Sequence, residues 1–341
     1  MNIAGNFPRR HQREQAGRMT IVIGTDEAGY GPNLGPLVVA ATAWRIEAAP
    51  AAAEEAVAGI ASRVANTVAA AGPLWGDSKQ IYRSGSGFAA LERGVLVGLL
   101  LAERSLPASW PALATVLGGI TPPAALLQGE WQRLAGLPLP READTKSCHG
   151  LAAAATAALA DGQASLVAMA GRAIYPGEFN ALLDRGLNKS DILSQATLDL
   201  AAALRAEFAD VPAVIWCDRH GGRKSYSALV ARHFTAPLLQ AIEETPSCSA
   251  YLIPSSRPAT PATQIEFRVG GESRLPVALA SMTAKYVREL AMQAFNGFWS
   301  ERAPGLMATA GYPVDARRWR AAAAAAIRAA GVADDALWRR V

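Results

Sequence analysis

Three acidic residues stand where hydrophobic runs of the sequence end. Asp26 and Glu27 follow the run Ile21–Ile23 closely, and Asp218 directly follows Ala213–Cys217. Carboxylates at the ends of strands in one sheet can converge on a divalent cation, which prefers hard oxygen ligands. Because neighbouring residues of a strand point to opposite faces, Asp26 and Glu27 can share a site only if their strand ends there. A candidate metal site follows, with an ordinary solvated turn as the alternative.

A further acid, Glu289, lies in a stretch with helical spacing. Ser281, Lys285 and Glu289 recur every four residues, which places them on one face of a helix. By itself this spacing is explained more simply by a surface ion pair between Lys285 and Glu289.

A glycine-rich turn separates the first pair of acids from the next hydrophobic run. Gly29, Gly31 and Gly35 alternate with prolines before Leu37–Ala41. Glycine lets backbone N–H groups approach a ligand closely. The pattern of strand, acids, turn and strand predicts a hairpin-like pair with carboxylates at its rim.

The composition bounds the class of protein. The chain has 341 residues, of which 51% are hydrophobic and 18% charged, as in globular proteins.

No stretch is suited to span a bilayer and no signal-peptide pattern opens the chain, so we expect no membrane partner. Three scattered cysteines fit a reducing compartment, and we expect a cytoplasmic location. The net charge of +4 permits a nucleic-acid partner. No segment of the sequence resembles a dimer interface, so we expect a monomer.

Strands alternating with helices predict an α/β sheet domain. We expect a basic disordered tail over 1–18, a catalytic domain over 19–300 and a C-terminal helical extension over 301–341. Helices are expected at 51–71, 88–103, 151–159, 191–208, 226–234, 276–295 and 315–330, and later strands at 165–174, 213–217, 250–253 and 264–269.

The chain resembles the bacterial ribonuclease HII (type 2 ribonuclease H) family through several motifs in the family's order. These are Asp26-Glu27-Ala28-Gly29-Tyr30-Gly31 with Gly35-Pro36, Asp77-Ser78-Lys79, Leu187-Asn188 before a helix, Asp218 with Gly221-Gly222, the helix Ala280 to Glu289, and Gly311-Tyr312-Pro313-Val314. Each motif is weak alone, but their common order is strong support for a relationship.

The resemblance implies a ribonuclease H-like mixed β-sheet flanked by helices. It also implies that Asp26, Glu27, Asp218 and Glu289 hold two Mg²⁺ or Mn²⁺ ions and act in catalysis. The implied substrate is RNA in an RNA–DNA hybrid, or ribonucleotides embedded in duplex DNA. Two such ions can activate a water and stabilise the departing oxygen of an in-line displacement.

The resemblance also assigns substrate-binding residues. Gly29, Tyr30 and Gly31 would grip the ribonucleotide backbone, where the 2′-OH distinguishes RNA. Lys79 would contact a phosphate, and Tyr312 would pack against the neighbouring sugar.

The chain departs from the family pattern at several places. Tyr30 replaces an arginine, which removes a cation near phosphate, Glu289 replaces an aspartate, and Val314 replaces a threonine. Stretches of about 45–75 and 83–165 exceed what the family normally carries. These departures motivate two alternatives: a hybrid-binding protein that keeps the fold but is catalytically impaired, and an interaction scaffold built on the insertions.

Two other clusters have open interpretations. His220 could reach the metal site or be a solvated loop residue. Arg317, Arg318 and Arg320 surround Trp319, which suits either a nucleic-acid backbone or a solvated helix face.

Overall fold

The computed structural model describes residues 19–82, 87–103, 105–124, 129–235, 238–255 and 261–340. The expected tail over 1–18 lies outside these ranges. The described helices include none with the length and apolar character needed to cross a bilayer.

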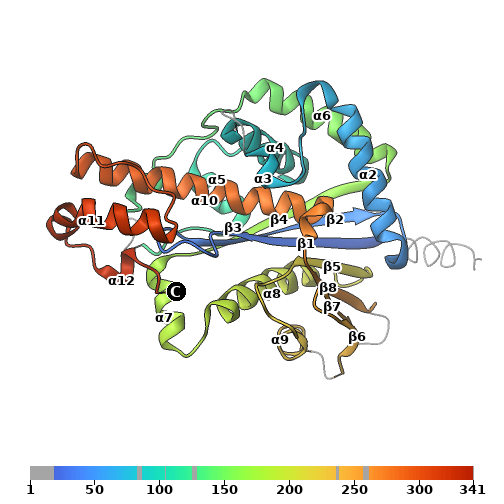
Figure 1. Cartoon of the computed structure of the whole chain (residues 1–341). Coiled ribbons are helices and arrows are strands. Elements are labelled where there is room, and N and C mark those ends of the chain that lie inside the picture. Colours follow the sequence, from blue (N-terminus) through green and yellow to red (C-terminus); the bar gives the residue numbers. More distant parts are fainter. Residues whose placement is uncertain are drawn as a thin grey trace, which may run out of the picture.

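A single mixed sheet organises the described chain (Figure 1). In spatial order its strands are β3 Gly118–Gly119, β4 Ala164–Ile174, β2 Leu37–Ile46, β1 Thr20–Ala28, β5 Ala213–Asp218, β8 Thr263–Arg268, β7 Cys248–Ile253 and β6 Gln240–Glu244. Neighbours β4, β2 and β1 are antiparallel, β1, β5 and β8 are parallel, and β8, β7 and β6 are again antiparallel. The predicted α/β class with a mixed sheet is confirmed, as is the hairpin-like pairing of β1 with β2.

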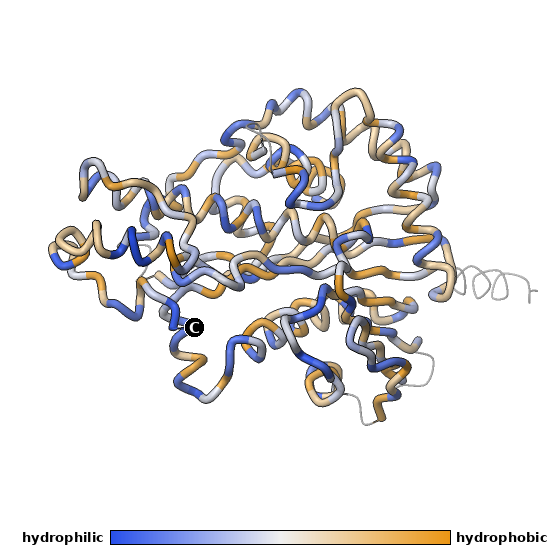
Figure 2. The backbone as a smooth tube through the Cα atoms, in the orientation of Figure 1, coloured by the Kyte–Doolittle hydropathy of each residue, from blue (hydrophilic) through white to orange (hydrophobic). Residues whose placement is uncertain are grey.

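The central strand β1 is buried on both faces, because its consecutive hydrophobic residues point alternately to the two sides of the sheet. Val22 joins the core above the sheet in Figure 1, whereas Ile21 and Ile23 join the core below it. Hydrophobic positions accordingly run along the central strands in Figure 2.

Helices cover both faces of the sheet (Figure 1). The upper layer contains α2 Ala53–Thr67, α3 Ser78–Ile81, α4 Gly87–Glu103, α5 Trp110–Leu117, α6 Thr145–Asp161 and α10 Leu275–Arg302. The lower layer contains α7 Pro176–Asp184, α8 Lys189–Glu207 and α9 Ser227–His233. The stretches 45–75 and 83–165 therefore contribute helices that bury core residues of the upper layer.

The long helix α10 begins in close contact with β1 and β2. A Cβ added to Gly24 would lie only 2.2 Å from the carbonyl carbon of Pro276. Thr42 Oγ1 donates a 2.8 Å hydrogen bond to the carbonyl of Pro276. Because Gly24 has no side chain, α10 can begin directly against β1. This contact sets the position of the α10 residues relative to the end of the sheet.

The expected C-terminal helical segment consists of α11 Pro313–Ala330 and α12 Asp334–Leu337. It joins the main core instead of standing beside it. Trp319 is fully buried and its ring centre lies 5.1 Å from that of Phe295 on α10. Trp338 forms a β-bridge with Leu34 in the glycine-rich turn.

Candidate active site

The acids of the first motif and Asp218 meet at one edge of the sheet. β1 and β5 run parallel with Thr25 opposite Cys217, so Asp26 and Asp218 leave adjacent strands at the same end. Both residues and Glu27 line one pocket of about 280 Å³. Asp26 is only 8% exposed, and its Oδ1 accepts a 2.8 Å hydrogen bond from the backbone N–H of Glu27. The three carboxylates thus line the same pocket. The expectation that β1 would end at Asp26 and Glu27 is wrong, because the strand stays paired with β2 as far as Ala28.

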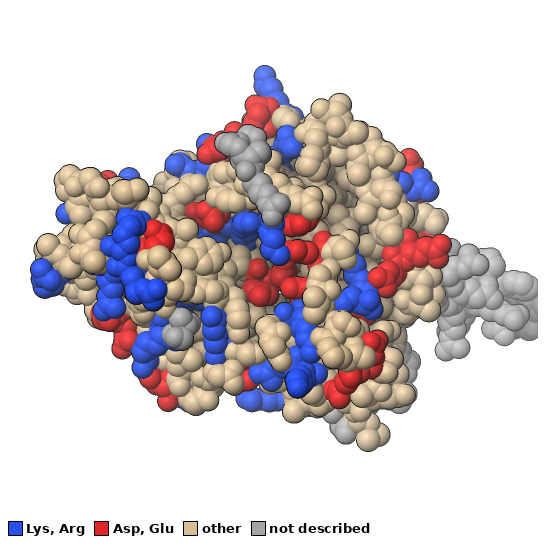
Figure 3. All heavy atoms as spheres, in the orientation of Figure 1, with Lys and Arg blue, Asp and Glu red and all other residues tan. Residues whose placement is uncertain are grey.

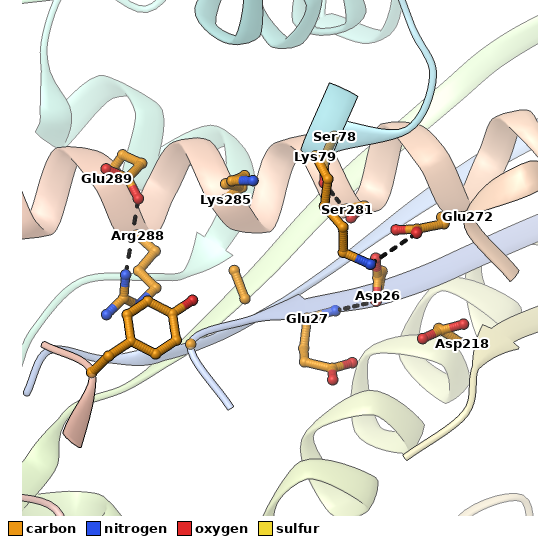
Figure 4. Close-up of a pocket in the computed structure, with 13 residues that line it drawn as sticks. Asp26, Glu27, Ser78, Lys79, Asp218, Glu272, Ser281, Lys285, Arg288 and Glu289 are labelled. Atoms are coloured by element: carbon orange, nitrogen blue, oxygen red, sulfur yellow. Dashed lines mark hydrogen bonds and ion pairs between the residues drawn. The ribbon is translucent and has the colours of Figure 1, made fainter. Parts of the chain in front are cut away.

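Glu272 is an acid of this pocket that the sequence analysis missed. It lies in a short 3₁₀ helix, Gly271–Ser273, between β8 and α10, and Figure 4 shows it beside Asp26. The backbone N–H of Gly271 donates to Asp218 Oδ1 at 2.9 Å. A Cβ on Gly271 would lie 3.3 Å from the Asp218 backbone, so the glycine permits this close approach. The pair Gly270-Gly271 before an acid was the available signal.

Glu289 also lines the pocket, with Ser281 and Lys285 on the same face of α10, as the four-residue spacing predicted. Its carboxylate, however, has a different partner: Oε2 accepts a 2.9 Å hydrogen bond from the Tyr82 hydroxyl. In Figure 4, Glu289 lies at the other end of the pocket from Asp218, with Lys285 and Ser281 between them.

Burial and mutual repulsion dominate the electrostatics of the acids. Burial, followed by the charge of Asp218, raises the pKa of Asp26 to about 7. Burial and the charges of Asp26 and Asp218 raise the pKa of Glu27 well above its ordinary value. The pKa of Asp218 is raised by burial and, further, by the charge of Glu272. A bound cation would relieve this repulsion.

The motif Asp77-Ser78-Lys79 borders the acids. The Asp77 side chain accepts a 2.8 Å hydrogen bond from the backbone N–H of Lys79 and so caps α3. Buried Ser78 lies 3.1 Å from Ser281, oxygen to oxygen. Lys79 Nζ lies 3.0 Å from Glu272 Oε1, so the only cationic partner described for that acid comes from this motif.

The glycine turn reaches the pocket through Gly29, whose φ of +84° favours glycine. A Cβ there would lie 2.6 Å from the Arg288 guanidinium nitrogen Nε. Tyr312 also lines the pocket and is 55% exposed. Tyr30 and Gly31 do not line it. Gly31 faces the Tyr312 ring, which a Cβ on Gly31 would approach to 3.7 Å.

Neither interpretation of His220 is right. The residue is 1% exposed, its Nδ1 lies 2.9 Å from Ser194 Oγ, and burial lowers its pKa to about 3. It packs edge-on against Tyr226 and Phe267. It is therefore a core histidine, neither solvated nor part of the pocket.

The basic cluster of α11 cannot use its tryptophan for base stacking, because Trp319 is fully buried. Arg318 pairs with Asp315 at 2.6 Å, and Arg320 pairs with Asp334 at 2.5 Å. A partly neutralised helix face describes this cluster better than a nucleic-acid platform.

The carboxylates offer the hard oxygen donors that Mg²⁺ and Mn²⁺ prefer, and their raised pKa values suit a cation-binding site. Within the described ranges, however, no three acidic, histidine or cysteine side chains are gathered tightly enough to hold a metal ion as they stand. Side-chain rotation would have to bring them onto one ion.

Comparisons with known proteins give similarity only among solved structures: no protein-family model and no curated protein matches the sequence. RNase HII of Archaeoglobus fulgidus, in a complex with PCNA, is 13% identical over 93% of each chain, with a TM-score of 0.40. Bst-RNase HIII in complex with Mn²⁺ is 16% identical over 100% of this chain and 72% of that one, with a TM-score of 0.43. Ribonuclease H2 from Pyrococcus horikoshii OT3 is 15% identical over 93% of this chain and 92% of that one, with a TM-score of 0.39. Similarity of this degree does not assign the chain to a family, so its function has to be argued from the site.

Proposed function

We propose that the chain is a metal-dependent endonuclease that hydrolyses RNA in RNA–DNA hybrids or ribonucleotides embedded in duplex DNA. The observation that carries this proposal is the convergence of Asp26, Glu27, Asp218 and Glu272 on one pocket beside a glycine turn and a lysine. The motif resemblance supplies the reaction class.

Asp26, Glu27 and Asp218 would hold the two Mg²⁺ or Mn²⁺ ions. For the fourth ligand we propose Glu272 in place of Glu289. The charge of Glu272 acts on both Asp26 and Asp218, whereas the Glu289 carboxylate is bonded to Tyr82. The ions would supply an activated water and charge stabilisation at the departing oxygen.

The remaining residues would bind and orient the substrate. Lys79 would contact a backbone phosphate, and exposed Tyr312 would pack against a sugar. Gly29 would present its backbone to the ribonucleotide. Tyr30 and Gly31 lie outside the pocket lining, so their contribution would be made on the adjoining surface. Figure 3 shows Lys and Arg side chains on both sides of the acidic hollow, which suits a polyanion that crosses it.

The test is cleavage of an RNA–DNA hybrid and of a duplex with one embedded ribonucleotide, each in Mg²⁺ and in Mn²⁺. We expect nicking by the unmodified chain and its loss in Asp26→Asn and Asp218→Asn, with an all-DNA duplex as the control substrate. Unchanged cleavage in both variants would reject the assignment.

A second candidate is a hybrid-binding protein without catalytic activity. It is favoured by the absence of a ready-made metal cluster among the described residues and by the ion pair that occupies Glu272. Tight hybrid binding without cleavage in either metal would support it. The monomeric state and the cytoplasmic location stay predictions; size-exclusion chromatography tests the first, and fractionation of cells the second.

A further inference from the structure

Lys189, the first residue of α8, carries an ammonium group in an electrostatically unfavourable place. Its Nζ lies 4.3 Å from the centre of the Tyr30 ring. Burial lowers the pKa of Lys189, and the charge of Arg339 lowers it further. The amino end of a helix also disfavours a cation.

No described carboxylate offsets these penalties. The nearest acid in sequence, Asp191, completes the capping box of α8 with Asn188 and is paired with Arg223. Arg223 also donates to Ser190 Oγ at 3.2 Å. The ring of Tyr30 attracts the ammonium, but it cannot satisfy three N–H donors. A partly desolvated cation with this environment suits an anion supplied from outside the chain.

Tyr30 joins this lysine to the candidate active site. It directly follows Gly29, which lines the pocket. The charge of Glu27 contributes to raising the pKa of Tyr30, after burial. A Cβ on Gly221, in the loop that follows Asp218, would lie 3.4 Å from the Tyr30 hydroxyl. Tyr30 therefore lies between Lys189 and the loop that follows Asp218.

We propose that Lys189 binds a backbone phosphate of the nucleic-acid substrate beside the glycine turn, with the Tyr30 ring holding its ammonium group in position. The inference rests on the proposed function. It gives the chain a partly exposed cation beside the turn, in addition to the buried Arg288 and Arg339, although residue 30 is a tyrosine.

The test uses the Asp218→Asn protein, which is expected to bind the hybrid without cleaving it, and a labelled RNA–DNA hybrid titrated over a series of NaCl concentrations. Each phosphate contact contributes about 0.9 to the slope of log affinity against log salt. Adding Lys189→Met is expected to reduce the slope by about that amount and to weaken binding roughly tenfold at ~0.1 M salt. Lys189→Arg, which keeps the charge, is expected to retain the slope.

Matched variants separate this role from a general loss of charge or structure. Lys146→Met removes an exposed lysine of α6 that does not line the pocket, and it should leave the slope unchanged. Tyr30→Phe should bind as the parent does, whereas Tyr30→Ala should weaken binding. Because Lys189 stands at a helix amino end, Lys189→Met should not lower the unfolding temperature.

The outcomes distinguish this inference from the function on which it rests. If the Asp218→Asn protein binds the hybrid and the added Lys189→Met leaves the salt slope unchanged, the role of Lys189 alone is overturned. If the Asp218→Asn protein does not bind the hybrid, both the role of Lys189 and the proposed function are overturned.

Discussion

The ammonium nitrogen of Lys79 lies 3.0 Å from Oε1 of Glu272, at the edge of the pocket that holds Asp26 and Asp218. The lysine side chain is 65% exposed, and pairs of this kind contribute only about 0–1 kcal/mol. A divalent cation could therefore displace Lys79 from Glu272 at little cost. Lys79 would then be free for a substrate phosphate.

Removing the charge of Glu272 is expected to reduce cleavage far more than removing the charge of Glu289. Loss of a supporting partner of a metal site lowers affinity or activity about 10–100-fold, and loss of a direct ligand should lower it further. We expect Glu272→Gln to reduce cleavage by more than ~100-fold and to weaken Mn²⁺ binding measured by calorimetry. Glu289→Gln, which keeps a hydrogen-bond acceptor for Tyr82, should stay within about tenfold of the parent. A larger loss of cleavage in Glu289→Gln than in Glu272→Gln would instead identify Glu289 as the fourth metal ligand.

Lys79→Met should separate metal binding from substrate binding. Without the competing ammonium group, Glu272 is free, so Mn²⁺ affinity should be equal to or tighter than that of the parent. Hybrid affinity should fall roughly tenfold at ~0.1 M salt, because one phosphate contact is lost. Lys79→Arg is the control, since it keeps the charge. Weaker Mn²⁺ binding in Lys79→Met would contradict competition between the lysine and the metal.

The stability of the metal-free protein should fall as pH rises. Asp26 has a folded-state pKa of about 7, raised from 3.8, so the folded state holds this proton more tightly than the unfolded state does. Its contribution is fully present below about pH 4 and is lost as pH rises through about 7, by up to roughly 4 kcal/mol.

Thermal unfolding in EDTA across this pH range checks the prediction. Asp26→Asn should make the unfolding temperature depend less on pH. Adding Mn²⁺ should raise the unfolding temperature most at the alkaline end of the pH range. A protein that becomes more stable from pH 5 to pH 8 in EDTA would show that other groups control the profile.

Gly24→Ala should be strongly destabilising. The new Cβ would lie 2.2 Å from the backbone of Pro276, so α10 would have to move away from β1. We expect a loss of about 3 kcal/mol or more in urea unfolding, together with reduced cleavage, because α10 and the turn before it carry Ser281 and Glu272. Gly59→Ala in α2 is the matched control: apart from the neighbouring backbone of α2 itself, no atom lies within 4 Å of the new Cβ, and the substitution should be neutral or stabilising by up to about 1 kcal/mol. Equal stabilities of the two variants would contradict the role of Gly24.

Local patterns in the sequence determined several features of this protein. The continuous hydrophobic run Ile21–Ile23 indicated β1, and acids at the ends of hydrophobic runs identified Asp26, Glu27 and Asp218, because both patterns depend only on neighbours in the chain. The four-residue spacing of Ser281, Lys285 and Glu289 likewise placed them together on one face of α10.

Only the tertiary structure decided which of these side chains meet, because a contact between two distant segments produces no periodic pattern in the sequence of either segment. Only the docking of α10 on Gly24 brings Glu272 beside Asp26 and turns Glu289 toward Tyr82. Only the packed core shows that His220 and Trp319 are buried. The cation over Tyr30 comes from Lys189, 159 positions along the chain, and only the fold could pair them.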